Sequence, residues 1–221
     1  MTIRKTPRTG SAEAIACPTL IEFLLDETGS MSICKPAVID GFNAFLSEQR
    51  ALGTSCQLTL TKFDSDGLKT PYVDLDIGMA VPMTDATFIP GSMTNLHDAI
   101  GTRLAAVNDR ISSFTVRPNI LFVVMTDGDE NASRSYSKAA IQGLIKANTE
   151  LGITFVYLGS TDHAADTARE LGFQPGNTKR FAANETRETF THLAAATSAY
   201  RATRTNVAST ERSFFSASSA N

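Results

Sequence analysis

The sequence is poor in residues that bind metals through nitrogen or sulfur. Its 221 residues include three histidines and three cysteines, and neither type shows the spacing of a zinc site or a CxxC pair. An odd number of scattered cysteines is typical of reduced thiols, so we expect a reducing compartment and a cytoplasmic location. No Gly-x-x-x-x-Gly-Lys-(Ser/Thr) phosphate loop is present, which argues against nucleotide hydrolysis.

The chain also lacks a strong charge and a long apolar run. Its formal net charge is −3 with an isoelectric point near 5.6, which argues against a nucleic-acid or anionic-membrane binder. No apolar run reaches the length of a membrane span, and the basic N-terminus lacks the apolar core of a signal peptide. A hydrophobic content of 42% over this length is enough for one substantial domain.

We expect that single domain to cover residues 18–204. Residues 1–17 are predicted to be a flexible lead-in, and residues 205–221, rich in Ser, Ala and Thr, a flexible tail. Phe214 and Phe215 are the exception within the tail. They are either an unremarkable apolar pair or a motif that docks onto this chain or another protein.

Strand-like and helix-like patterns alternate along the domain. The strand patterns cover residues 20–25, 57–63, 69–77, 119–126, 153–158 and 179–182. The helical patterns cover residues 36–52, about 91–113, 137–151, 162–171 and 185–204. This order predicts an α/β fold: a Rossmann-like, doubly wound, mostly parallel sheet of about six strands flanked by helices, with one antiparallel edge strand.

Two details of the first half refine this prediction. Residues 57–63 and 69–77 alternate apolar and polar side chains around a turn, so they are expected to pair as a hairpin at the sheet edge. Glu22 interrupts the first apolar run. Because an unpaired buried carboxylate is costly, Glu22 must lie near an end of the sheet or find a cationic partner.

Oxygen-bearing side chains follow the apolar strands at Asp26-Glu-Thr28-Gly-Ser30 and at Asp127-Gly-Asp. A third such segment, Gly91-Ser-Met-Thr94, opens the helical pattern over about residues 91–113. In open α/β sheets, ligands bind outside the carboxyl ends of the strands, so these segments are expected to meet there.

Together they would supply two carboxylates and three hydroxyls around one point. Such a set suits a hard cation, Mg²⁺ first, with Mn²⁺ or Ca²⁺ as alternatives.

Each of these residues also has a purely structural interpretation. Asp26 and Thr28 are suited to capping a strand–helix junction, Thr94 to an N-cap, and Asp127 to a turn. Asp98, in a first helical turn, is expected to be structural. The other loop acids are expected to be solvated charges around the metal face: Glu27, Asp64, Asp66, Asp129 and Glu130. Of these, Glu27, Asp129 and Glu130 are the candidates for contact with a partner.

The three segments resemble the metal-ion-dependent adhesion site (MIDAS) of von Willebrand factor type A (vWA) domains. That family's pattern is Asp-x-Ser-x-Ser, a later Thr, and a later Asp usually followed by Gly. Here Thr28 stands where serine is usual, which keeps the hydroxyl. The resemblance covers about residues 18–204 of this chain. More loosely, the chain resembles stand-alone vWA proteins of bacteria and phages.

The resemblance implies a fold, a ligand set and a mode of binding. Thr28, Ser30 and Thr94 would contact the metal, and Asp26 and Asp127 would bind it directly or through water. A partner's Asp or Glu would complete the coordination shell. The expected function is therefore a divalent-metal-dependent protein–protein interaction module without a nucleic-acid or membrane partner.

Two other classes of function compete with this expectation. One is a structural or assembly component of a phage or multiprotein complex. The other is a metal-assisted hydrolase or phosphatase with Asp26 as nucleophile, which requires a second acid where Thr28 stands. A hydrolase also needs a general base, and His97, the histidine in a site segment, is expected to point away from the site. We therefore predict that the protein is not an enzyme.

Overall fold

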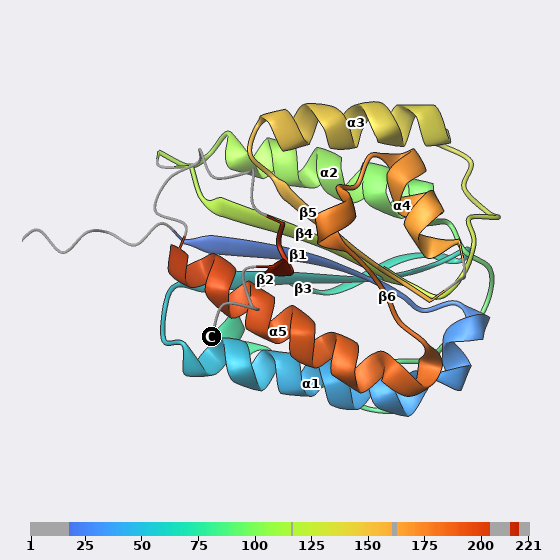
Figure 1. The fold of residues 1–221 in the computed structure, drawn as a ribbon, viewed down its shortest axis with the longest axis horizontal. Coiled ribbons are helices and arrows are strands. Elements are labelled where there is room, and N and C mark those ends of the chain that lie inside the picture. The colour runs from blue at the N-terminus through green and yellow to red at the C-terminus, as the bar shows by residue number, and fades with distance from the viewer. Residues whose placement is uncertain (1–17, 116, 161–162, 204–212, 217–221) are drawn as a thin grey trace, which may run out of the picture.

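The structure, a computed structural model, is described here for residues 18–115, 117–160, 163–203 and 213–216. A six-stranded sheet lies between two layers of helices (Figure 1). The strands are β1 (Thr19–Asp26), β2 (Cys56–Asp64), β3 (Gly67–Asp76), β4 (Asn119–Thr126), β5 (Thr154–Gly159) and β6 (Thr178–Arg180). Their order is β3-β2-β1-β4-β5-β6, and every neighbouring pair is parallel except β2–β3. The predicted fold class, including the antiparallel edge strand, is confirmed.

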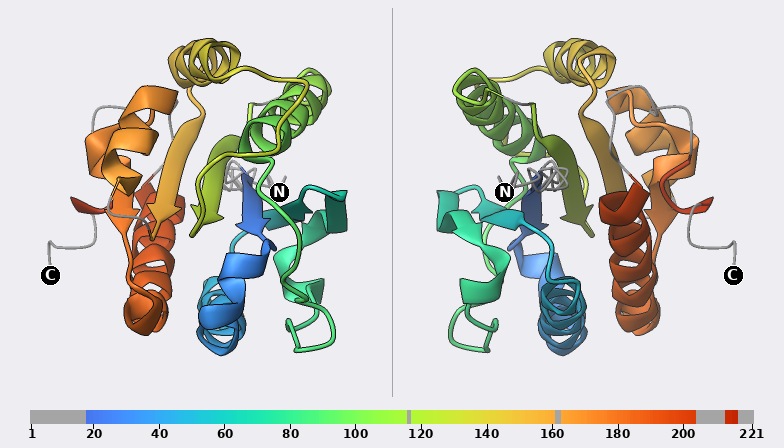
Figure 2. Two further views of the ribbon diagram at one scale, coloured as in Figure 1. Left: turned by 90° about the vertical axis from the view of Figure 1, so that its right-hand side faces the viewer. Right: turned by 90° about the vertical axis from the view of Figure 1, so that its left-hand side faces the viewer.

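Five α-helices cover both faces of the sheet in the described part of the chain. Helices α1 (Lys35–Ala51) and α5 (Thr186–Thr203) cover one face, and α2 (Leu96–Ile111), α3 (Lys138–Glu150) and α4 (Ala164–Leu171) cover the opposite face (Figure 1). Figure 2 shows the strands lying between these two layers. Short 3₁₀ turns occupy Gly29–Ile33, Ile77–Met79, Pro175–Asn177 and Ala183–Glu185. No helix among these residues is long and apolar enough to cross a membrane.

Two helix starts differ from the expectation. Helix α2 begins at Leu96 rather than near residue 91, because residues 91–95 run as irregular backbone bonded to neighbouring loops. Helix α4 begins after His163, and its expected N-cap, Asp162, lies outside the described residues.

The central strands are buried on both faces, which explains their unbroken apolar sequences. Every residue of β1 and of β4 is buried. Glu22 of β1 is paired with a cation as expected, because Arg103 of α2 donates to it from Nε at 2.7 Å. Burial raises the pKa of Glu22 to about 7, and Arg103 opposes the rise.

Part of the expected tail docks onto the domain. The Phe214 side chain is buried against Tyr200, with the ring centroids 6.1 Å apart. The Phe214 amide donates to Asn177 Oδ1 at 2.8 Å, and Ser213 Oγ donates to the Gly176 carbonyl at 2.8 Å. Of the alternatives considered for Phe214 and Phe215, the structure therefore shows docking onto this chain. The expected lead-in, residues 1–17, lies outside the described residues.

Helices α1 and α5 meet the sheet through a cluster of phenylalanines. Phe23 of β1 lies 5.4 Å from Phe42 of α1 and 6.3 Å from Phe190 of α5, measured between ring centroids. The close approach of the two helices requires a glycine, because a methyl group at Gly41 would overlap the Phe190 ring.

We predict that Gly41→Ala destabilises the protein by about 1–3 kcal/mol, although alanine is the better helix former. Gly143, exposed in the middle of α3 with nothing within 4 Å of an added Cβ, is the matched control. Gly143→Ala should instead stabilise the protein by about 0.5–1 kcal/mol. Urea denaturation of both variants measures the two effects, and equal shifts would contradict this account of the α1–α5 contact.

Candidate functional site

Parallel pairing of β1 with β4 sets the first two parts of the site side by side. Leu25 is in register with Met125, so Asp26 and Thr126 end adjacent strands. Thr126 Oγ1 donates to Asp26 Oδ2 at 2.5 Å, and the Thr28 amide donates to Asp26 Oδ1 at 2.7 Å. The Asp26 side chain is therefore fixed from both sides at the sheet's carboxyl edge.

The residues after these strands continue the contact. Ser30 Oγ donates to Asp127 Oδ1 at 2.6 Å, across 97 positions of sequence. The Thr28 and Ser30 hydroxyl oxygens lie 3.2 Å apart. Asp26, Thr28, Ser30 and Asp127 thus form one contiguous group of oxygens.

Thr94 reaches the same group through the loop that follows β4. Its amide donates to Asn131 Oδ1 at 2.9 Å, and its carbonyl accepts from the Asn131 and Ala132 amides at 3.0 and 2.9 Å. The N-cap of α2 is Asn95, so the Thr94 hydroxyl does not serve as a helix cap. The N-cap interpretation of Thr94 therefore does not apply.

The space beside Gly128 shows how these oxygens converge. A Cβ placed on Gly128 would lie 3.0 Å from Thr94 Oγ1, 3.6 Å from Ser30 Oγ and 4.0 Å from Asp26 Oδ2. Glycine thus leaves open a cradle that a side chain would fill, lined by the oxygen donors that Mg²⁺ prefers. Among the described residues, no group of three or more His, Cys, Asp or Glu side chains forms a metal site, and this donor set of two carboxylates and three hydroxyls does not require one.

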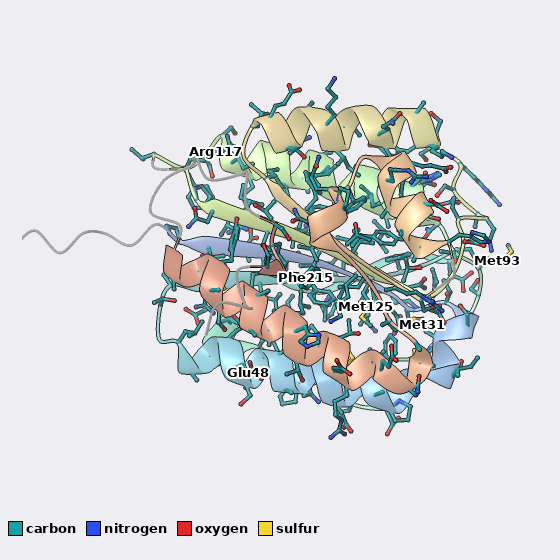
Figure 3. The ribbon with its side chains drawn as sticks, viewed as in Figure 1. Met31, Glu48, Met93, Arg117, Met125 and Phe215 are labelled. Atoms are coloured by element: carbon teal, nitrogen blue, oxygen red, sulfur yellow. The ribbon has the colours of Figure 1, made fainter. Side chains whose placement is uncertain are left out.

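Figure 3 gives the position of this cradle in the molecule. Met31 and Met93, each next to a residue of the group, lie toward one end, and Glu48 and Arg117 lie at the opposite end. The Gly29 and Ser30 side of the cradle is exposed, whereas Asp26 is fully buried. One side of the cradle therefore faces solvent.

Burial makes both carboxylates unusually basic. It raises the pKa of Asp26 from 3.8 to about 6, against the hydrogen bonds from Thr126 and Thr28 that lower it. The nearby Asp127 charge adds to the rise. Burial also raises the pKa of Asp127, and the Ser30 hydroxyl opposes this. Such a pair favours a compensating cation.

The expected acidic rim is wrong at Glu27 and Asp64, which are buried, whereas Asp66 and Asp129 are exposed. Glu27 is only 1% exposed, and its carboxylate accepts from Lys62 Nζ at 2.6 Å. Asp64 is also buried and accepts from Lys69 Nζ at 3.2 Å. Neither side chain is a solvated charge, because each is buried and paired with a lysine, Lys62 with Glu27 and the more exposed Lys69 with Asp64. Glu27 therefore does not offer a surface to a partner.

Glu130 is likewise occupied within the protein. One oxygen accepts from the Ala132 and Ser133 amides at 2.9 and 2.7 Å, and the other from the His97 amide at 2.8 Å. This carboxylate therefore joins the loop after β4 to the start of α2. Asp129 is the exposed candidate of the three.

Asp98 is structural, as expected. It accepts from the Arg134, Ser135 and Tyr136 amides at 2.8–2.9 Å. Burial raises the pKa of Asp98, but these hydrogen bonds together outweigh burial, so its pKa is lowered on balance.

Two residues that position the site were not identified from the sequence. Thr126 holds Asp26, and Asn131 holds Thr94. The place of Thr126, a hydroxyl at the end of a central apolar strand, was a usable signal because adjacent parallel strands end together. Asn131 carried no comparable signal, because its partner is 37 residues away.

Among known proteins, only solved structures resemble this chain. No protein-family model matches the sequence, and no curated protein matches it. Proximal thread matrix protein 1 of the mussel byssus aligns over 81% of this chain and 48% of its own, with a TM-score of 0.57 and 16% identity. The pilus adhesin SpaC of Lactobacillus rhamnosus GG aligns over 83% of this chain and 30% of its own, with a TM-score of 0.63 and 16% identity.

A third structure, manganese-loaded TRAP of Plasmodium vivax, aligns over 78% of this chain and 72% of its own, with a TM-score of 0.51 and 15% identity. The chain spans about half or less of the first two proteins. All three are vWA-domain proteins, and the fold described above is the vWA type of Rossmann-like fold. At these identities the likeness shows the fold alone.

The raised pKa of Asp26 predicts that the metal-free protein loses stability as pH rises. A carboxyl whose pKa is higher folded than unfolded stabilises the folded state at low pH, and this stabilisation is lost between about pH 4 and 6. Asp26→Asn should therefore stabilise the metal-free protein at pH 7 by roughly 1–3 kcal/mol, and by much less at pH 4.

Urea denaturation in chelator at both pH values measures this difference. Asp129→Asn, at an exposed loop position, is the control and should change little at either pH. Destabilisation of Asp26→Asn at pH 7 would contradict the account.

Proposed function

We propose that this chain is a divalent-metal-dependent protein-binding module whose metal is held by Asp26, Thr28, Ser30, Thr94 and Asp127. The observation that carries the proposal is the convergence of Thr94, Ser30 and Asp26 oxygens on the open space beside Gly128. Mg²⁺ is the proposed ion, with Mn²⁺ and Ca²⁺ as alternatives, because all five donors are hard oxygens.

The charge and exposure of the site support a role in binding. Two carboxylates balance one divalent ion, and the neutral hydroxyls leave the metal attractive to one further anionic ligand. Since Ser30 is exposed and Asp26 is buried, that ligand would approach from the solvent side. We propose that a partner protein supplies it as an Asp or Glu side chain, and that Asp129 lies near the contact.

Structural relatives with metals support the choice of cofactor class. Proximal thread matrix protein 1 is known with a zinc-occupied MIDAS motif, at 14% identity to this chain. The TRAP structure is loaded with manganese. We extend divalent-metal binding to this chain because its own residues provide an oxygen cradle.

We further propose a non-catalytic, cytoplasmic protein of the stand-alone vWA type. Thr28 occupies the position where an aspartyl-phosphate mechanism needs a second acid. His97 is partly buried with Nδ1 3.8 Å from Glu130, and burial lowers its pKa. Cys34 and Cys56 are buried free thiols, which suits a reducing compartment.

Metal binding is tested first by isothermal titration with Mg²⁺. We predict that Thr94→Ala weakens the affinity by tenfold or more, about 1.4 kcal/mol, by removing one ligand. Gly128→Ala should weaken it similarly, because the added methyl lies 3.0 Å from Thr94 Oγ1. Asp129→Asn should retain the affinity within about twofold, and equal affinities across all four proteins would contradict the proposed site.

Partner binding is tested by capture from lysate of the native host with immobilised protein. A partner bound through the metal should be recovered in Mg²⁺, lost in chelator, and lost with Thr94→Ala. Asp129→Asn should still recover the same protein in Mg²⁺, at reduced yield, because Asp129 is proposed to lie near the contact without binding the metal. Recovery that survives both chelator and Thr94→Ala would contradict a metal-bridged contact.

A further inference from the structure

Glu27, the residue after Asp26, is the centre of a buried ionic network. Its carboxylate accepts from Lys62 Nζ at 2.6 Å, from Lys69 Nζ at 3.2 Å and from the Ile89 amide at 2.8 Å. The carboxylate is 1% exposed, and Lys62 is 8% exposed. A buried carboxylate with three donors is held in one orientation.

The backbone of Glu27 continues the same attachment. Its carbonyl accepts from the Gly91 amide at 2.9 Å, and the Gly29 amide donates to the Ser92 carbonyl at 3.2 Å. Residues 27–29 therefore run beside residues 89–92. Thr94 lies two residues beyond Ser92, so this attachment helps to place the Thr94 hydroxyl relative to Asp26.

The other two connections within the site are made differently. Thr126 joins the loop after β4 to Asp26, and Asn131 joins that loop to Thr94. Glu27 supplies the third side of this triangle, between the Asp26 loop and the Thr94 segment. It does so through the Ile89 amide and through Lys62 of β2, which also donates to the Thr87 carbonyl. Each metal-binding segment is thereby fixed to both of the others.

We propose that Glu27 is a positioning residue for the metal site, holding the Thr94 segment against the Asp26 loop through the Ile89 amide and Lys62, while Lys69 helps to orient the Glu27 carboxylate. This inference rests on the metal-binding function proposed above. Residues behind metal ligands that orient them typically change metal affinity by about 10–100-fold when replaced. Glu27 does so here without contacting the metal or a partner.

A second physical effect must be separated from positioning. Glu27 carries a negative charge close to the cradle, and losing it would weaken cation binding even without any movement. The two effects differ in sign when a lysine is removed. Without Lys62, the uncompensated Glu27 charge would tighten cation binding, whereas loss of positioning would weaken it.

The experiment measures Mn²⁺ affinity by electron paramagnetic resonance, and folding by urea denaturation, for wild type, Glu27→Gln, Lys62→Met and Lys69→Met. We expect Glu27→Gln and Lys62→Met each to bind Mn²⁺ roughly tenfold more weakly or worse. Lys69, 54% exposed at its side chain, should show the same direction with a smaller change.

Glu22→Gln is the matched control. Glu22 is another buried, ion-paired carboxylate of β1, but its partner is Arg103 of α2 rather than the Thr94 segment. This variant should keep Mn²⁺ affinity within about twofold of wild type, because Glu22 pairs with Arg103 of α2 and not with the Thr94 segment. Weak Mn²⁺ binding by Glu22→Gln would mean that losing any buried ion pair of β1 is enough, and would overturn the proposed role.

The outcomes separate this inference from the function on which it rests. Wild type that fails to bind Mn²⁺ overturns the metal site itself. If wild type binds Mn²⁺ and Lys62→Met binds it equally well or more tightly, only the positioning role of Glu27 is overturned, and the metal site stands. If Lys62→Met does not fold, the direction of the change in Lys69→Met decides the question.

Discussion

Burial of Asp26 beside Asp127 is the constraint on which the site depends. The parallel register of β1 and β4 brings two acids to one edge of the sheet, where burial raises the pKa of Asp26 to about 6. The hydroxyls of Thr126 and Ser30 donate to the two carboxylates and keep them separate and oriented. Burial of these two acids destabilises the metal-free fold, and a bound cation would offset that cost.

The surrounding structure keeps this acidic pair rigid. Phe23 of β1 packs against α1 and α5 on one face of the sheet, and Glu22 of β1 pairs with Arg103 of α2 on the other face. Glu27 then fastens the strand's end to the segment that carries Thr94. The position of each oxygen in the cradle therefore follows from contacts well outside it, as precise coordination by a small ion requires.

Much of this could be predicted from sequence because it depends on local patterns. Apolar runs that stop at Asp26 and Asp127 indicate parallel strands whose ends meet, and their alternation with helices predicted the mostly parallel sheet, although not its strand order. Glu22 within an apolar run predicted either a place near an end of the sheet or a cationic partner, and Arg103 is that partner. The hydroxyls near the acids then indicated the chemistry of the space between them.

The remainder depends on contacts between distant residues. Glu27 has the composition of a solvated loop acid, and its partners Lys62 and Ile89 are 35 and 62 positions away. The same holds for Glu130, which bonds the His97 amide 33 positions away. Local composition cannot distinguish an exposed acid from one whose partner arrives from another strand, so the expected acidic rim was wrong at these positions.

Anomalous X-ray diffraction from crystals grown with saturating Mn²⁺ tests the central claim most directly. The account predicts one strong peak beside Gly128, about 2.1 Å from hydroxyl oxygens of Ser30 and Thr94. The absence of a peak in the cradle, or Mn²⁺ bound instead at other acidic loops, would contradict the account.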